Sequence, residues 1–180
     1  MGETLIREFL MARKKHDFYP TPSWATEKLL EQFPMAGVIG EPCTGAGDVA
    51  NVLRRHGEVW TNDIDRSHVA DSYHDLADPD SWARLPDCDW IVTNPPFNIA
   101  AAIVPAAHEK ARLGVAMLLR LSYLEPCQNR AQWLAGHPPT TLLVIPRISF
   151  TGDGKTDNCP TAWMIWDKRA GAKTEIIVAR

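Results

Sequence analysis

Four consecutive residues, Asn94-Pro95-Pro96-Phe97, have the clearest chemical potential in this sequence. They follow an apolar stretch, CDWIVT, that predicts a strand. The prolines would rigidify the turn and hold the Asn94 side-chain oxygen and the Pro95 carbonyl as two acceptors. Two acceptors on a planar NH2 group favour a pyramidal nitrogen, and the Phe97 ring offers a stacking surface. The turn therefore predicts activation of a planar amino group; the alternative is a proline-rich turn that only ends a strand.

A glycine-rich turn and an acidic residue at a strand end form a second candidate site, one that could bind a ligand. In VIGEPCTGAGDVANVL, an apolar strand ends at Glu41, and the chain then passes through Gly45 and Gly47 into a helix. Because glycine has no Cβ, the backbone of this turn can come close to a bound nucleoside. About 20 residues later, the segment EVWTNDID predicts a strand that ends at Asp63, with Asp65 beyond it in a loop. Doubly wound α/β folds place a carboxylate at this position to bind the ribose hydroxyls of a ligand. The G-x-G spacing of Gly45 and Gly47 lacks the third glycine of a dinucleotide-binding fingerprint, so NAD and FAD are less favoured as ligands. The structural alternatives are a tightened turn for the glycines and a helix cap for Asp63.

These residues need a sheet whose strands end side by side, and the rest of the chain predicts one. Apolar runs alternate with helical segments, which favours an α/β fold with a mostly parallel sheet and helices on both faces. After Pro146 the pattern RISFTGDGKTDNCPTAWMIWDK, followed by TEIIVAR, predicts antiparallel strands at a sheet edge. Strands are expected at 38–42, 58–63, 88–94, 114–119 and 141–146, and helices at about 23–33, 47–56, 98–112 and 127–135.

Composition limits the class of protein. The chain has 180 residues, 45% hydrophobic and 23% charged, so we expect one domain over 1–180. Four scattered cysteines disfavour disulfides and zinc, and the absence of a long apolar run disfavours secretion and membrane insertion, so a cytoplasmic location is expected. The net charge of −3 leaves only local basic patches for phosphate contact, at 13–16 and at Arg147 with Lys155; either patch could equally be a solvated charged face.

The order of motifs resembles that of the amino-group class of S-adenosylmethionine-dependent methyltransferases, and specifically the small phage- and prophage-type DNA N6-adenine methyltransferases. DFYPTP, EPCTGAG, TNDID and NPPF occur in that order at 17–22, 41–47, 61–65 and 94–97. The resemblance implies a class I methyltransferase (Rossmann-like) fold with seven strands and an antiparallel edge strand. It also implies S-adenosylmethionine as cofactor, bound by Thr21, Pro22, Glu41, Gly45, Gly47, Asp63 and Asp75.

We therefore expect methyl transfer to the N6 amino group of adenine in double- or single-stranded DNA of a bacterial host cell. Asn94, Pro95 and Phe97 would be catalytic, and no metal is expected. The base would be flipped out or taken from a single strand. Only about 34 residues follow Pro146, too few for a separate target recognition domain, so low sequence specificity is expected. Pro96, Arg147 and Lys155 are the candidate substrate-binding residues.

Two alternatives remain open at this stage. NPPF-type turns also occur in methyltransferases that act on RNA adenine or on a protein glutamine amide, and both groups are planar amines. A non-catalytic module that binds a nucleoside or a partner on the same scaffold is the alternative of another class, because fold does not fix function. The sequence predicts no oligomeric state.

Overall fold

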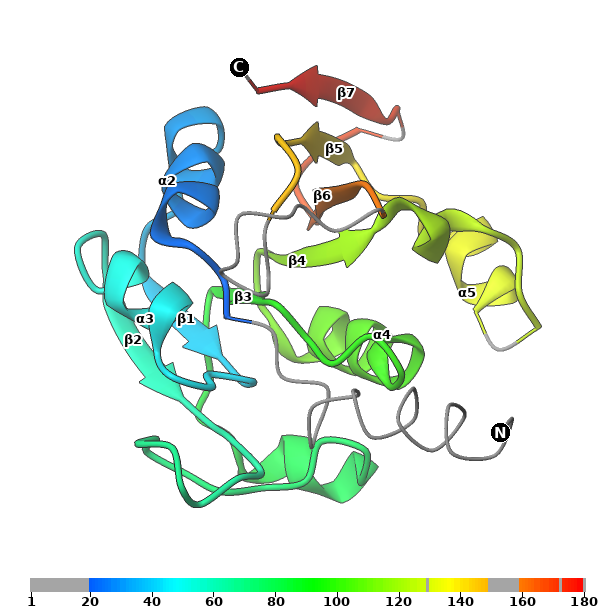
Figure 1. Cartoon of the computed structure of the whole chain (residues 1–180). Helices are drawn as coiled ribbons and strands as arrows, with labels where there is room; N and C mark the ends of the chain where they lie inside the picture. The colour runs from blue at the N-terminus through cyan, green and yellow to red at the C-terminus, as the bar shows by residue number, and fades with distance from the viewer. Residues whose placement is uncertain (1–19, 129, 149–158, 172, 180) are drawn as a thin grey trace, which may run out of the picture.

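The computed structural model describes residues 20–128, 130–148, 159–171 and 173–179. In them the chain forms a seven-stranded sheet in the order β2-β1-β3-β4-β6-β5-β7 (Figure 1). The strands are β1 (Val38–Glu41), β2 (Glu58–Thr61), β3 (Trp90–Thr93), β4 (Gly114–Arg120), β5 (Thr141–Val144), β6 (Thr161–Asp167) and β7 (Glu175–Val178). The helices are α2 (Ser23–Gln32), α3 (Asp48–Leu53), α4 (Ala100–Lys110) and α5 (Ala131–Gly136), with two 3-10 segments, η2 (Pro79–Arg84) and η3 (Leu121–Leu124).

The predicted α/β fold class and mostly parallel sheet are confirmed, but the position expected for the antiparallel strand is wrong. Among the strands of the described residues only β6 runs antiparallel to its neighbours, and it lies between β4 and β5. The strand at the edge, β7, is parallel to β5. The physical reason is burial: six of the seven residues of β6 are buried, whereas Ile176 and Val178 of β7 are exposed. A strand that is apolar on both faces is stable inside a sheet and not at its edge.

Helices cover both faces of the sheet, because alternate residues of each strand point to opposite sides. On one face α2 and α3 pack against strand residues that include Trp163 of β6. On the other face α4, η2 and α5 pack against residues that include Trp166 of the same strand. Trp163 and Ile165 of β6 therefore belong to one apolar layer, and Met164 and Trp166 belong to the other.

Three helices are shorter than expected, and one of them is α4, which spans Ala100–Lys110 of the predicted 98–112. The segment predicted as helix over 47–56 forms α3 only up to Leu53, and the following residues form a turn before β2. Gly57 ends that turn, and a Cβ there would lie 2.5 Å from the Gly37 carbonyl oxygen, so the two backbones meet closely. The segment predicted from 127 becomes helical only at Ala131.

Strands β1, β3 and β4 are parallel, so their carboxyl ends share one edge of the sheet. The glycine turn follows β1 there, and the NPPF turn follows β3. The end of β2 lies beside that of β1, and Asn62 and Asp63 follow it. The described helices include none with the length and apolarity that a membrane-spanning helix requires.

Candidate functional site

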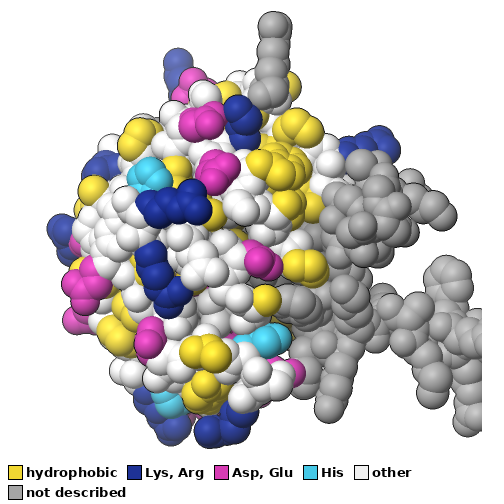
Figure 2. All heavy atoms as spheres, turned by 60° about the vertical axis from the view of Figure 1, so that its left-hand side comes forward, with side chains coloured by type: hydrophobic (Ala, Val, Ile, Leu, Met, Phe, Trp, Pro, Cys, Tyr) yellow, Lys and Arg dark blue, Asp and Glu magenta, His cyan; other side chains and the backbone are white. Residues whose placement is uncertain are grey.

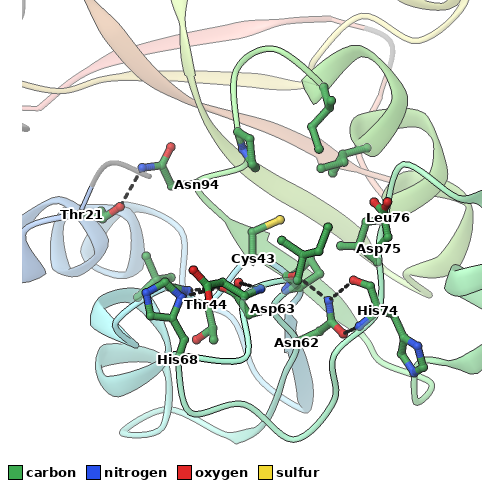
Figure 3. Close-up of a pocket in the computed structure, with 18 of the residues that line it drawn as sticks. Thr21, Cys43, Thr44, Asn62, Asp63, His68, His74, Asp75, Leu76 and Asn94 are labelled. Carbon is green, nitrogen blue, oxygen red and sulfur yellow. Dashed lines mark hydrogen bonds and ion pairs between the residues drawn. The ribbon is translucent and has the colours of Figure 1, made fainter. Parts of the chain in front are cut away.

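A cleft with a cavity volume of about 230 Å³ opens at this carboxyl edge (Figure 3). Its walls come from the start of α2, the glycine turn after β1, the segment after β2 and the turn after β3. Six of the residues predicted from the sequence line it: Thr21, Gly45, Asp63, Asp75, Asn94 and Pro96. Segments far apart in the chain thus contribute to one concave site, as expected for a ligand-binding edge of an α/β sheet.

Asn94 enters the cleft with its side-chain amide held in one orientation. Its Nδ2 atom donates a hydrogen bond of 3.0 Å to Oγ1 of Thr21, which is buried. The Asn94 oxygen therefore points away from Thr21, as Figure 3 shows. This orientation presents an acceptor, which is the atom that a substrate NH2 group requires.

Asp63 joins the end of β2 to the glycine turn. Its Oδ2 atom accepts a hydrogen bond of 2.7 Å from the Gly45 N–H, and its Oδ1 atom accepts one of 2.8 Å from the Asp65 N–H. His68 lies beside it, with Nδ1 3.4 Å from Asp63 Oδ2. A carboxylate oxygen has two lone pairs, so these contacts leave Asp63 able to accept a ligand hydroxyl as well.

Asn62 is a site residue that the sequence analysis missed. It is fully buried, and its Nδ2 atom donates to the carbonyls of Pro42 and His74, each at 3.1 Å. Its Oδ1 atom accepts from the His74 N–H at 2.8 Å and from the Ser72 hydroxyl at 2.9 Å. These bonds hold the segment before Asp75 against the glycine turn. The position directly before Asp63 was the available signal, but nothing local distinguishes a buried bridging amide from an exposed one.

Glu41 does not line the cleft, although the resemblance implied a place beside the cofactor. Its side chain is fully buried at the end of β1, where the Thr93 hydroxyl donates to Oε1 at 2.5 Å. Burial raises the pKa of Glu41 from 4.5 to about 7, against the opposing effect of the Thr93 hydrogen bond. Because Thr93 directly precedes Asn94, Glu41 links the ends of β1 and β3 from inside the fold.

The Glu41 pKa predicts a pH-dependent stability. Between pH 4.5 and about 7 the folded chain binds more protons at Glu41 than the unfolded chain does, so its contribution to the free energy of unfolding decreases as the pH rises. The slope reaches at most about 1.4 kcal/mol per pH unit, or on the order of 3 kcal/mol over the window. Glu41→Gln stays neutral and should remove this slope in urea titrations at pH 5, 6, 7 and 8.

The exposed Glu109→Gln is the matched control, because it makes the same chemical change away from the cleft. It should keep the wild-type slope. An unchanged slope in Glu41→Gln would show that this carboxyl is already ionised at pH 5.

Five further predicted residues do not line the cleft. Pro22 is the N-cap of α2, and Gly47 is the N-cap of α3 in a left-handed conformation with a φ of 85°. Pro95 is buried in its turn, and Arg147 is exposed after β5. Phe97 packs against both apolar layers, and the guanidinium of Arg120, at the end of β4, lies 4.7 Å from its ring centre. The predicted Lys155 and the basic run at 13–16 lie outside the described residues.

The cleft is acidic. Asp48, Asp63, Asp65 and Asp75 line it, and its described lining contains no lysine or arginine. This charge suits a cationic ligand and is unfavourable for a ligand rich in phosphates. The residues thus fit S-adenosylmethionine, which carries a sulfonium, an ammonium and ribose hydroxyls. Among the described residues no group of three or more His, Cys, Asp or Glu side chains is placed to hold a metal ion.

The cleft also contains a cysteine, Cys43, from the glycine turn. Burial raises the pKa of its thiol well above the ordinary value of 9.0, and the neighbouring Glu41 and Asp63 carboxyls act in the same direction. The thiol therefore stays protonated, which disfavours a nucleophilic role.

Comparison with solved structures identifies the fold. The chain matches the type I restriction-modification system methyltransferase subunit from Streptococcus thermophilus with a TM-score of 0.65 and 13% identity, over 95% of this chain and 50% of that one. It matches a dimethyladenosine transferase from Plasmodium falciparum with a TM-score of 0.60 and 14% identity, over 83% and 62%. A predicted O-methyltransferase from Agrobacterium tumefaciens matches with a TM-score of 0.57 and 16% identity, over 88% and 85%.

The chain thus has the Rossmann-like α/β fold of class I methyltransferases. It spans about half of the Streptococcus subunit and less than two thirds of the Plasmodium transferase. No protein-family model and no curated protein matches it. The matched proteins are described as acting on different acceptors, so the acceptor must be argued from the cleft.

Proposed function

We propose that this chain transfers a methyl group from S-adenosylmethionine to the N6 amino group of adenine in DNA. The observation that carries the proposal is Asn94, whose amide oxygen is directed away from Thr21 in the same cleft that Gly45 and Asp63 line. A hydrogen-bond acceptor beside an acidic, nucleoside-sized cleft suits transfer between a cationic cofactor and an amine.

The cofactor supplies an electrophilic methyl group on its sulfonium. Asn94 Oδ1 and the Pro95 carbonyl would accept the two hydrogens of the adenine amine, which favours a pyramidal nitrogen with its lone pair directed at the methyl carbon. Transfer would form a carbon–nitrogen bond as the carbon–sulfur bond breaks, with the electron pair of that bond left on the sulfur, and the nitrogen would then lose one proton to water. The chain's own contribution is to hold the amine in line and to bind the ribose at Asp63.

The DNA substrate is supported by the motif order and by the description of the Streptococcus subunit. An adenine inside a duplex cannot reach a cleft of this kind, so the base would be flipped out or supplied by a single strand. On the face turned forward in Figure 2, basic side chains are interspersed with acidic ones. Contacts to phosphates would therefore depend on a few local residues, of which Arg147 is a described candidate.

We expect methylation to depend only loosely on sequence. Discrimination at each base pair needs a side chain at a base edge and is worth about 1–3 kcal/mol, so reading several pairs requires an element that fills a groove. The candidate element is the segment from about 147 to 160, most of which lies outside the described residues. Sequencing N6-methyladenine across a treated plasmid tests this, and methylation confined to one site of four or more base pairs would contradict it.

Incubation with labelled S-adenosylmethionine and, in parallel, DNA, RNA or protein tests the function itself. Label in N6-methyladenine of DNA supports the proposal. Label in RNA adenine or in a glutamine amide would assign the same chemistry to another acceptor. If the chain binds the cofactor but transfers label to none of the acceptors, the result would favour the non-catalytic alternative, a module that binds a nucleoside.

A further inference from the structure

The contact between Thr21 and Asn94 joins two segments 73 residues apart in the lining of the cleft. Thr21 is 4% exposed, and its Oγ1 atom accepts the hydrogen bond from the Asn94 amide. The resemblance to the methyltransferase family places Thr21 beside the methionine carboxylate of the cofactor. The geometry instead directs its hydroxyl oxygen to the residue that would hold the acceptor amine (Figure 3).

Thr21 is held firmly enough to orient another side chain. Prolines on both sides restrict its backbone, and Pro22 begins α2 by accepting a hydrogen bond from the Ala25 N–H at 2.9 Å. The Ala25 carbonyl in turn accepts a buried hydrogen bond of 2.8 Å from the indole of Trp163 in β6. The sheet therefore fixes the start of α2, which fixes Thr21.

An asparagine amide has two ends of nearly equal size, and only one of them accepts hydrogen bonds. Rotation of the amide by half a turn would place N–H donors where a substrate NH2 group needs an acceptor. A hydroxyl can donate as well as accept, so the Thr21 contact restrains rotation of the Asn94 amide, and a substrate NH2 group, which offers only N–H donors, pairs with the oxygen at the other end. We infer that the Thr21 hydroxyl is a positioning group that holds the Asn94 amide in the orientation that serves the acceptor amine. This inference rests on the proposed function, and it assigns Thr21 to turnover rather than to cofactor affinity.

Thr21→Val removes the hydroxyl and keeps the shape of the side chain. We expect it to lower kcat about tenfold, while the cofactor Kd from calorimetry stays within about twofold. Thr21→Ser restores the hydroxyl and should recover kcat to within about threefold. Thr26→Val is the matched control, because Thr26 is a buried threonine of α2, outside the cleft lining, whose hydroxyl has no hydrogen-bond partner among the described residues.

The Asn94 side-chain amide resonances in a ¹⁵N–¹H spectrum, assigned by their loss in Asn94→Asp, test the contact without any turnover. They should shift in Thr21→Val and return toward the wild-type position in Thr21→Ser. Unchanged resonances in Thr21→Val would overturn the inference.

Three kinetic outcomes would also overturn it: an unchanged kcat in Thr21→Val, a raised cofactor Kd with normal kcat at saturation, or an equal loss of kcat in Thr26→Val. If the wild-type chain methylates no adenine, the proposed function fails. The amide spectrum then decides the Thr21 contact by itself, so the two failures are distinguishable.

Discussion

Asn94→Ala is expected to lower the rate of methyl transfer by about 100-fold or more while the cofactor Kd changes only a few fold. Asn94 lines the cleft with its oxygen directed away from Thr21, and the interaction of this oxygen with the amine is expected to strengthen as the nitrogen becomes pyramidal. Losing an interaction that matters mainly in the transition state lowers kcat and leaves ground-state binding largely intact. Single-turnover kinetics on adenine-containing DNA, with calorimetry for the cofactor, measure both quantities.

Asn98→Ala is the matched control for that experiment. Asn98 is an exposed asparagine four positions along the same segment, and it does not line the cleft. Its variant should transfer methyl groups at the wild-type rate. Normal turnover in Asn94→Ala would show that the NPPF turn is not the active site, and the proposed function would fail with it.

Asp63→Ala should weaken cofactor binding by about 1–3 kcal/mol, or roughly 5- to 150-fold. The change removes the carboxylate expected to bind ribose hydroxyls, and it also leaves the Gly45 N–H, which now donates to Asp63 at 2.7 Å, without its acceptor. The glycine turn therefore loses its link to the end of β2. Calorimetry with S-adenosylmethionine measures the loss, and circular dichroism checks that the variant remains folded.

Asp65→Ala is the comparison, since Asp65 lines the same cleft and carries the same charge. Its effect on the cofactor Kd should be several-fold smaller than that of Asp63→Ala. If Asp65→Ala causes the larger loss, the ribose carboxylate is Asp65, and Asp63 serves only to hold the turn.

Much of the site could be predicted from local patterns. The strands before Glu41, Asp63 and Asn94 are short apolar runs, and each is followed by residues that break a strand or face a ligand. Parallel strands separated by helices end at the same edge of the sheet. The order of the elements along the chain therefore predicts that the glycine turn, the acidic strand end and the NPPF turn lie close together. Gly45, Asp63 and Asn94 lie in one cleft for that reason.

Other features depend on partners far away in the sequence. The position of β6 inside the sheet follows from burial on both faces, which requires β4 and β5 as neighbours. Asn62 is a bridge only because the backbone around His74 packs against it. Local patterns do not encode such pairings, because a buried hydrogen bond forms where two segments are brought together by the packing of the whole sheet.

By itself, then, the sequence determined the chemistry of the residues and the edge of the sheet at which they collect. The tertiary structure decided how each side chain is used. It moved Glu41 from the cleft into the interior, where desolvation raises its pKa to about 7. It also placed the Thr21 hydroxyl against the Asn94 amide. The physical reason is the same in both cases. The sequence determines the functional group of each side chain, but the packing of α2, β1 and β3 at one edge of the sheet determines how deeply that group is buried and which hydrogen-bond partners it meets.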